Sequence, residues 1–224
     1  MTGMRAFRVP TLAGQFVLVI EAQDELKHCP AKVGTLNTRI HTSRHKGSLM
    51  SHELIDRNYI HRGRVFDVSL SRFNSEAKGE VEIEVVHHNG GAGALPLFED
   101  GSVALVRQWR YPLNRYSLEI CAGRIEPGQT PEETAARELE EELGYRAREL
   151  RKIGEFNVAP GYCNERIFLY LATGLKESAQ NLDDDEEIEV LKLPFEEALA
   201  RMRAGEIDDA KSIITLLLAA PLIR

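Results

Sequence analysis

The sequence predicts an α/β fold in which a mixed β-sheet lies between layers formed by a few helices. Two observations lead to this fold class. Short apolar segments with strand character recur from residue 64 onward, and only three segments carry the start and stop signals of helices. With 224 residues, of which 43% are hydrophobic, the chain is long enough for one main domain and a small addition.

The first 49 residues are expected to form a poorly ordered extension. Residues 26–52 contain no acidic side chain and show neither helical nor alternating periodicity. The apolar run at 16–20 is too short for a signal peptide or a membrane span. We therefore expect an extension over 1–49, a β subdomain over 50–91 and the main domain over 92–224, with no membrane partner.

The strand signals begin with a β-hairpin. Apolar residues alternate with polar ones over 66–70 and again over 81–85, and the segment between them, 74–79, is rich in turn formers. Six further segments have the length and composition of strands. They are residues 92–98, 103–109, 118–121, 148–158, 166–172 and 188–193.

The helix signals are more local. Residues 130–133, TPEE, form a capping box with proline at the first helical position, so a helix should begin there and run to about residue 143. Gly144 is well placed to end it in a left-handed conformation. Two more helices are expected over 195–204 and 209–220.

Charge and cysteine usage narrow the function classes. The chain has 28 basic and 35 acidic residues, a formal charge of -7, which argues against nucleic-acid binding through neutralised phosphates. The three cysteines, Cys29, Cys121 and Cys163, are far apart and form no CxxC pair, so neither a zinc site nor a disulfide framework is indicated. A cytoplasmic location is the expectation.

The predicted helix over 130–143 carries a high density of carboxylates. Glu138 and Glu142 lie one helical turn apart on the same face, with Glu141 beside them. An acidic helix is most often a solvated surface. Here the preceding loop contains Gly123 and can bring peptide groups next to the carboxylates, and clustered hard oxygen ligands suit Mg²⁺ or Mn²⁺.

The segment 123–145, GRIEPGQTPEETAARELEEELGY, resembles the Nudix box, a motif with many residues fixed at set spacing. It departs from the motif once, because Gln129 stands where the first glutamate is usual. The residues in register are Gly123, Arg137, Glu138, Leu139, Glu141, Glu142, Gly144 and Tyr145.

The resemblance implies a Nudix-like α/β/α sandwich with a mixed β-sheet, preceded by the β-hairpin subdomain, and hydrolysis of a nucleoside diphosphate linked to another group. It implies Mg²⁺, or Mn²⁺, as cofactor. The implied metal ligands are Glu138, Glu142 and the carbonyl of Ala122, with assistance from Glu141. Arg137 adjoins them, and a bidentate bond from its guanidinium would orient a glutamate.

The flanking segments resemble the ADP-ribose pyrophosphatase branch of this family. An arginine-bearing strand leads to the box, a Pro-Gly loop follows it at 160–165, and an acidic loop lies at 183–187. The implied substrate-binding residues are Arg110, Arg107, Glu119 and Glu165. The implied catalytic residues are Glu186 as first choice for the base, Asp184 as second choice, Arg137 and Glu141.

Three alternatives to ADP-ribose hydrolysis remain open. Cys121 and residues 189–195 are also similar to GDP-mannose-cleaving relatives, which makes another nucleotide sugar the leading alternative. A nucleoside triphosphate pyrophosphatase and a non-catalytic nucleotide-binding module rank lower. The family resemblance further implies a homodimer formed through the N-terminal β subdomain, in which Tyr59 or Phe66 would be core, interface or adenine-stacking residues.

Overall fold

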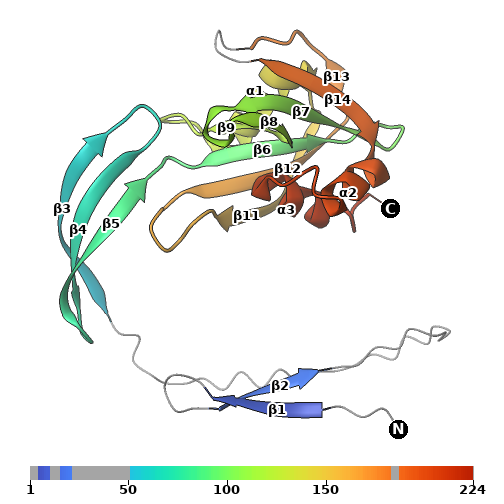
Figure 1. Cartoon of the computed structure of the whole chain (residues 1–224). Helices are drawn as coiled ribbons and strands as arrows, with labels where there is room; N and C mark the ends of the chain where they lie inside the picture. Colours follow the sequence, from blue (N-terminus) through green and yellow to red (C-terminus); the bar gives the residue numbers. More distant parts are fainter. Residues whose placement is uncertain (1–4, 11–15, 22–50, 183–186, 224) are drawn as a thin grey trace. The chain divides into compact units, whose positions relative to one another are not determined.

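The computed structural model describes residues 5–10, 16–21, 51–182 and 187–223. The chain divides into two compact units, Met1–Ser48 and Leu49–Arg224 (Figure 1). In the first unit, strands β1 (Arg5–Pro10) and β2 (Phe16–Glu21) pair antiparallel. These two strands lie within the stretch expected to be poorly ordered. The rest of that stretch lies outside the described residues, so the regional boundaries stay a prediction.

The second unit begins with a three-stranded antiparallel sheet, β3-β4-β5. The hairpin of β4 (Asp67–Ser75) and β5 (Gly79–His87) matches the sequence prediction. Strand β3 (His52–Arg62) was not predicted. Its side chains are exposed at ten of eleven positions, so no buried face imposes the alternation that reveals a strand.

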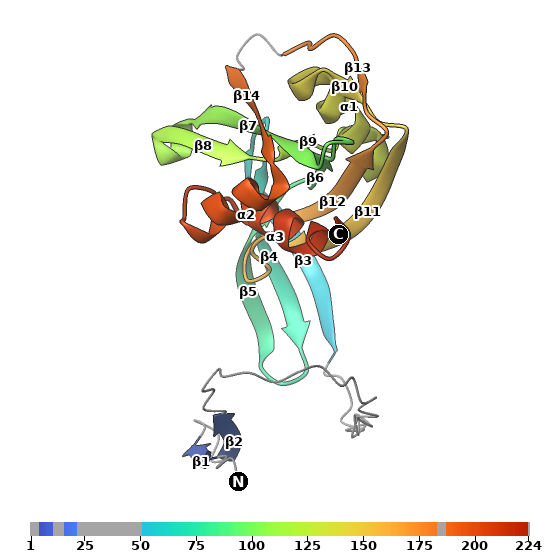
Figure 2. The same cartoon turned by 90° about the vertical axis from the view of Figure 1, so that its right-hand side faces the viewer.

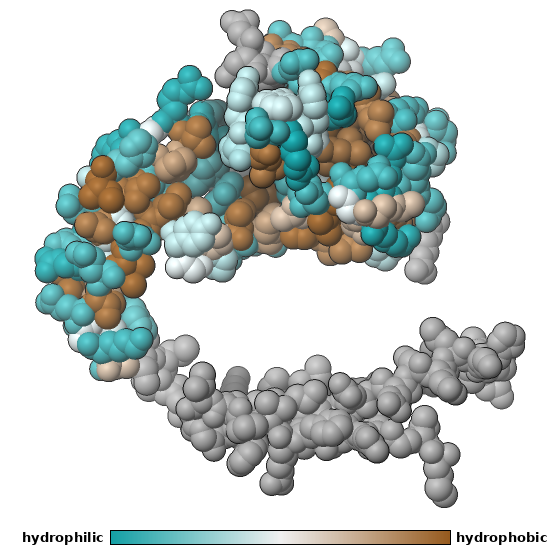
Figure 3. Space-filling view, viewed as in Figure 1, coloured by the Kyte–Doolittle hydropathy of each residue, from teal (hydrophilic) through white to brown (hydrophobic). Residues whose placement is uncertain are grey.

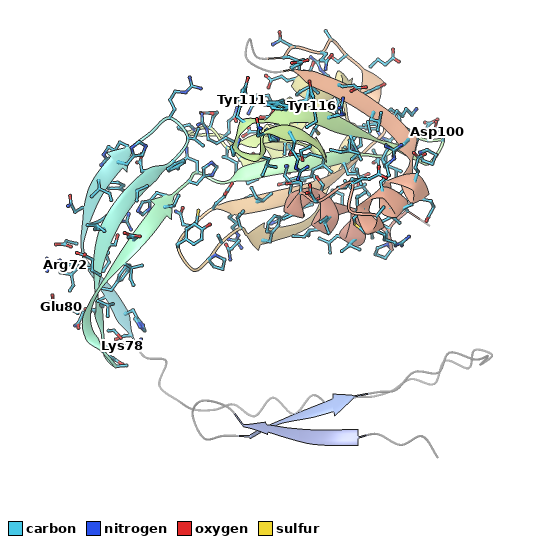
Figure 4. The ribbon with its side chains drawn as sticks, in the orientation of Figure 1. Arg72, Lys78, Glu80, Asp100, Tyr111 and Tyr116 are labelled. Carbon is cyan, nitrogen blue, oxygen red and sulfur yellow. The ribbon has the colours of Figure 1, made fainter. Side chains whose placement is uncertain are left out.

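The two faces of this N-terminal sheet differ in polarity. One face carries Leu54, Phe73 and Ile83, and the pairs Leu54–Phe73 and Ser71–Ile83 place these residues on the same side. The opposite face carries Arg72, whose guanidinium contacts Glu80 at 3.5 Å (Figure 4). Figure 3 shows hydrophobic surface over these strands. Leu54 and Ile83 are 47% and 42% exposed, which makes this an apolar sheet face at the surface of the described chain.

Two further sheets form the centre of the second unit. The first has the order β11-β12-β6-β9, in which β12 and β6 run parallel and the other pairs antiparallel. The second has the order β14-β7-β8 and is antiparallel. The bounds of these strands are β6 (Gly91–Pro96), β7 (Ser102–Arg110), β8 (Arg115–Glu119), β9 (Cys121–Arg124), β11 (Glu149–Asn157), β12 (Arg166–Thr173) and β14 (Ile188–Pro194).

The strand predicted over 118–121 is wrong in one respect, because the chain changes sheets within it. Strand β8 ends at Glu119 and pairs with β7, whereas β9 begins at Cys121 and pairs with β6. Ile120 at the junction is buried, and its N–H donates to the Ser212 hydroxyl at 2.8 Å. Local apolar character gave no sign of this break. Three short elements were also not predicted: η1 (Tyr111–Leu113), β10 (Tyr145–Arg146) and β13 (Lys176–Glu177).

Three helices cover the sheets from opposite sides, as Figures 1 and 2 show. Helix α1 (Pro131–Leu143) packs through Ala135, Leu139 and Leu143 into one hydrophobic cluster. Helices α2 (Phe195–Arg203) and α3 (Ala210–Ala219) pack into a second cluster with alternate residues of the same strands. The expected α/β/α sandwich on a mixed sheet is confirmed. Among the described residues, no helix has the length and apolar character needed to cross a membrane.

Candidate active site

Helix α1 is fixed at both ends by the signals that the sequence carries. The Glu133 N–H donates to Thr130 Oγ1 at 3.2 Å, and the Thr130 N–H donates to Glu133 Oε2 at 2.8 Å, which completes the capping box. Gly144 ends the helix with φ of 71°. The apolar face of α1 is buried against the sheet. Glu138 and Glu142 lie next to that face, on the side of the helix that packs against β9.

The two glutamates converge on the start of the Nudix-like segment. Their residues are only 7% and 3% exposed, respectively. The Ala122 N–H donates to Glu142 Oε2 at 3.2 Å. The Glu138 carboxylate lies directly over Gly123, where a Cβ atom would stand 1.7 Å from Glu138 Oε1. Only glycine leaves room for this carboxylate, which gives a physical reason for the first residue of the motif.

Arg137 holds the carboxylates of this helix in place. It contacts Glu138 Oε1 at 2.7 Å and Glu141 Oε2 at 2.5 Å. Burial lowers the pKa of Arg137, but the two neighbouring glutamates raise it overall, so the guanidinium stays charged. Its buried Nε atom has no hydrogen-bond partner in the described chain. These contacts make Arg137 an orienting residue for the acidic cluster.

The oxygen atoms around Ala122 and Gly123 fit a hard divalent cation. Two carboxylates that are nearly buried and one helical turn apart repel each other, and a cation held between them would compensate their charge. Among the described residues, no group of three or more His, Cys, Asp or Glu side chains is arranged to hold a metal ion by itself. Gln129 accepts a hydrogen bond from the Thr134 hydroxyl at 3.2 Å, which uses its amide oxygen at the start of the helix.

A cavity of about 450 Å³ lies beside these oxygen atoms. Arg110, Glu165 and Lys211 line it together with Ala122 and Gly123. The sequence prediction had named four of these five residues; Lys211 was not among them. The remaining lining residues are Val65, His88, Gly91, Ala92, Arg124 and Ile167.

Two predicted substrate-binding residues take other positions. Side chains alternate between the two faces of a strand, and Arg107 and Arg110 are three residues apart on β7. Arg107 therefore points to the side opposite Arg110 and contacts Glu189 at 2.9 Å. Glu119 has a side chain only 4% exposed and accepts two hydrogen bonds from Arg110, at 2.8 and 2.7 Å. It therefore serves as a partner of Arg110 beneath the cavity. The substrate contacts assigned to Arg107 and Glu119 stay predictions that this arrangement does not support.

The two residues predicted as the catalytic base, Glu186 and Asp184, lie outside the described residues. The adjoining Glu187 is exposed and lines a small surface pocket with Trp109, Tyr111 and Tyr116. Figure 4 shows the two tyrosines near η1 and β8.

Three polar residues that line the cavity, Arg124, His88 and Lys211, were not in the sequence prediction. Arg124 follows the first box glycine directly, so its position was a usable signal; it donates to the Arg64 carbonyl at 2.6 Å. His88 lies 3.5 Å from Glu165. His88 and Lys211 come from distant parts of the chain and had no local motif to mark them.

Comparison with known proteins agrees with this geometry. Residues 87–215 match the NUDIX domain model. The chain is 36% identical over 165 residues to an ADP-ribose pyrophosphatase of Bacillus subtilis, covering 73% of this chain and 89% of that protein. It is 37% identical over 150 residues to a GDP-mannose pyrophosphatase of Cronobacter sakazakii, covering 59% and 78% of the two chains.

The fold has a counterpart among solved structures. A crystal structure of an ADP compounds hydrolase superposes with a TM-score of 0.69 at 21% identity, covering 79% of this chain and 96% of that one. The domain match spans more than half of the chain and includes helix α1, which carries the converging carboxylates. The chain belongs to the Nudix family.

Proposed function

We propose that this protein hydrolyses the pyrophosphate bond of a nucleoside diphosphate sugar, with Mg²⁺ as cofactor and ADP-ribose as the first-choice substrate. The observation that carries the proposal is the convergence of Glu138 and Glu142 on Ala122 and Gly123 at the edge of a cavity lined by Arg110. Nudix hydrolases generally use divalent cations, and Mn²⁺ is a second candidate. The products from ADP-ribose are AMP and ribose 5-phosphate.

The metal site is assigned to Glu138, Glu142 and the Ala122 carbonyl, with Glu141 assisting. A divalent cation bound there supplies charge neutralisation for the diphosphate and lowers the pKa of the attacking water. Arg137 keeps two of the glutamates oriented through its contacts at 2.7 and 2.5 Å. Arg110 binds a phosphate and stabilises negative charge as the bridging P–O bond breaks.

Glu186 is assigned as the general base that accepts the proton of the attacking water, with Asp184 as second choice. The oxygen of water forms a bond to one phosphorus, the bridging oxygen leaves with the other phosphate, and the carboxylate accepts the proton. Glu165 lines the same cavity as Arg110 and is proposed to contact the substrate.

A neighbouring cavity provides space for the nucleoside. It measures about 320 Å³, and Tyr59, Phe66 and His87 are among its lining residues. It shares Val65 and His88 with the cavity that contains Arg110, so the two are adjacent. Ring stacking is available in this second cavity.

The leading alternative is GDP-mannose or another nucleotide sugar. It is supported by the likeness to the Cronobacter sakazakii protein named GDP-mannose pyrophosphatase, at 37% identity. Cys121, which marked this alternative in the sequence, is fully buried, and its Sγ donates to the Ala94 carbonyl at 3.2 Å. It is therefore a core residue, and any choice between the sugars rests on the cavity walls.

We also propose that the protein is a homodimer that associates through the apolar face of the N-terminal sheet. The exposed residues Leu54 and Ile83 give that face an apolar character that a second copy can cover. The absence of nucleic-acid partners and the cytoplasmic location stay predictions from charge and cysteine usage.

A substrate panel tests the proposed function. The purified full chain is assayed with Mg²⁺ on ADP-ribose, GDP-mannose, ADP-glucose, NADH and dGTP, with products identified by mass in ¹⁸O water. We expect two monophosphate products from at least one nucleotide sugar, and the ¹⁸O label marks the attacked phosphorus. If dGTP is the only compound turned over and pyrophosphate is released, the protein is a nucleoside triphosphate pyrophosphatase. If no compound is turned over, the non-catalytic nucleotide-binding module is favoured.

A further inference from the structure

Lys211 is a nearly buried cation at the cavity that the motif does not include. It lies in the first turn of α3, and its side chain is 14% exposed. Its Nζ atom forms an ion pair with Glu119 Oε2 and lies 3.1 Å from Asp209 Oδ2. Asp209 also caps the helix by accepting from the Ser212 N–H at 2.9 Å. The lysine therefore projects from a capped, rigid helix.

Glu119 connects Lys211 to Arg110. Its Oε1 accepts from Arg110 Nε at 2.8 Å, and its Oε2 accepts from both Arg110 Nη2, at 2.7 Å, and Lys211. Burial raises the pKa of Glu119, but the hydrogen bonds of Arg110 and the charge of Lys211 lower it to about 2. The carboxylate is thus an anion held between two cations that both reach the cavity.

We infer that Lys211 is a positioning residue that fixes the Arg110 guanidinium in the cavity by holding the shared carboxylate of Glu119. This inference rests on the proposed function, because it concerns the arginine assigned to phosphate. The bidentate contact couples the orientation of the Arg110 guanidinium to that of the Glu119 carboxylate. Lys211 anchors one carboxylate oxygen to α3, so the orientation of Arg110 depends on a helix that lies 92 residues further along the chain than Glu119.

The loss of Lys211 has two consequences for Arg110. The Glu119 carboxylate keeps one cationic partner and gains freedom to rotate. Its pKa also rises, because one of the two charges that lower it is removed while burial remains. Protonation then converts one accepting oxygen into a donor and breaks the bidentate contact with Arg110.

A double-mutant cycle tests whether Lys211 acts through Arg110. We compare kcat/KM for the best nucleotide sugar in the wild type, K211M, R110K and the double variant, with K211R as the conservative replacement. K211M should lower kcat/KM by roughly tenfold, the scale of a misaligned charge contact. It should have less than about a twofold further effect in the R110K background, and K211R should recover most of the activity.

Two readouts separate positioning from a structural role. In K211M, the pH below which kcat/KM falls should be higher than in the wild type, because the loss of Lys211 raises the pKa of Glu119 from its lowered value. In ¹⁵N-labelled wild type, the hydrogen-bonded Arg110 Nε–H should give a distinct resonance, identified by its absence in R110K. That resonance should broaden or shift in K211M.

The matched control is K192M, which removes a lysine paired with Asp100 at 3.3 Å, outside this cavity. It should leave kcat/KM and the Arg110 resonance unchanged. Equal losses from K211M in both backgrounds would show direct contact of Lys211 with substrate and overturn the inference. So would normal kcat/KM per folded molecule with an unchanged resonance. A wild type without nucleotide-sugar turnover would instead refute the proposed function, and the resonance comparison would still test the positioning of Arg110.

Discussion

Replacing Gly123 with alanine tests the geometry of the carboxylate site directly. The added Cβ would stand 1.7 Å from Glu138 Oε1 and 2.2 Å from its Cδ. Non-bonded contacts below 3.0 Å are essentially never seen for Cβ atoms, so the carboxylate must move by about 1.3 Å, from 1.7 to at least 3.0 Å. Glu138 is only 7% exposed, which leaves it little space to move without disturbing α1.

The expected effect on catalysis is larger than the effect on stability. A displacement of about 1 Å at reacting groups costs roughly 10²-fold in rate, so G123A should lower kcat/KM for the best nucleotide sugar by about that factor. Overpacking at this site should lower the free energy of unfolding by about 1–3 kcal/mol. Steady-state kinetics across a Mg²⁺ titration, together with urea unfolding, measures both quantities.

Gly161 provides the matched control for this substitution. No atom lies within 4 Å of the position of its Cβ, and its φ is not in the left-handed region, so G161A should keep both activity and stability. Wild-type kcat/KM in a folded G123A variant would refute the reasoning, because it would mean that the position of Glu138 over Gly123 has no bearing on the reaction.

Three further predictions concern stability and assembly. Because the pKa of Glu119 is lowered to about 2, its stabilising contribution is full above its usual value of 4.5 and is lost as the pH falls toward 2. The difference in unfolding free energy between wild type and E119Q, about 3 kcal/mol near neutral pH, should therefore shrink when urea titrations are repeated at pH 3; a constant difference would contradict the charged pairing. T130A should cost about 1 kcal/mol of unfolding free energy by removing the α1 cap, with kcat per folded molecule retained; no loss of stability in urea would count against the capping box. I83E should shift the protein toward monomer in light scattering, whereas E82Q on the opposite face should not; unchanged mass for I83E would exclude this face as the dimer contact.

The parts of the fold that the sequence predicted are those with local signals. Helix α1 is encoded by a capping box at Thr130 and a terminal glycine at 144, and the structure contains both. Strands β6, β7 and β12 each contain a run of buried apolar residues and were found for the same reason. Strand β3 was missed because its faces are exposed, and the change of sheets at Ile120 depends on pairing with distant strands.

The residues of the candidate site also divide into those with a local sequence signal and those brought together only by the fold. Glu138, Glu142 and Ala122 come from one contiguous motif, so their proximity follows from helix geometry and a short loop. The contacts of Glu119 with Lys211 and of His88 with Glu165 join residues that are 92 and 77 positions apart, and only tertiary packing brings them together. Arg107 and Arg110 look equivalent in the sequence, and strand alternation decides which of them faces the cavity.

The central claim is that the buried carboxylates of α1 bind the cation on which hydrolysis depends. Its most direct test compares E142Q with E132Q, a substitution of an exposed glutamate on the same helix, by Mg²⁺ binding calorimetry and by kcat for the best nucleotide sugar. We expect E142Q to weaken Mg²⁺ binding and lower kcat by about 10²-fold or more, and E132Q to match the wild type. Equal Mg²⁺ affinity and turnover in E142Q and wild type would contradict the claim.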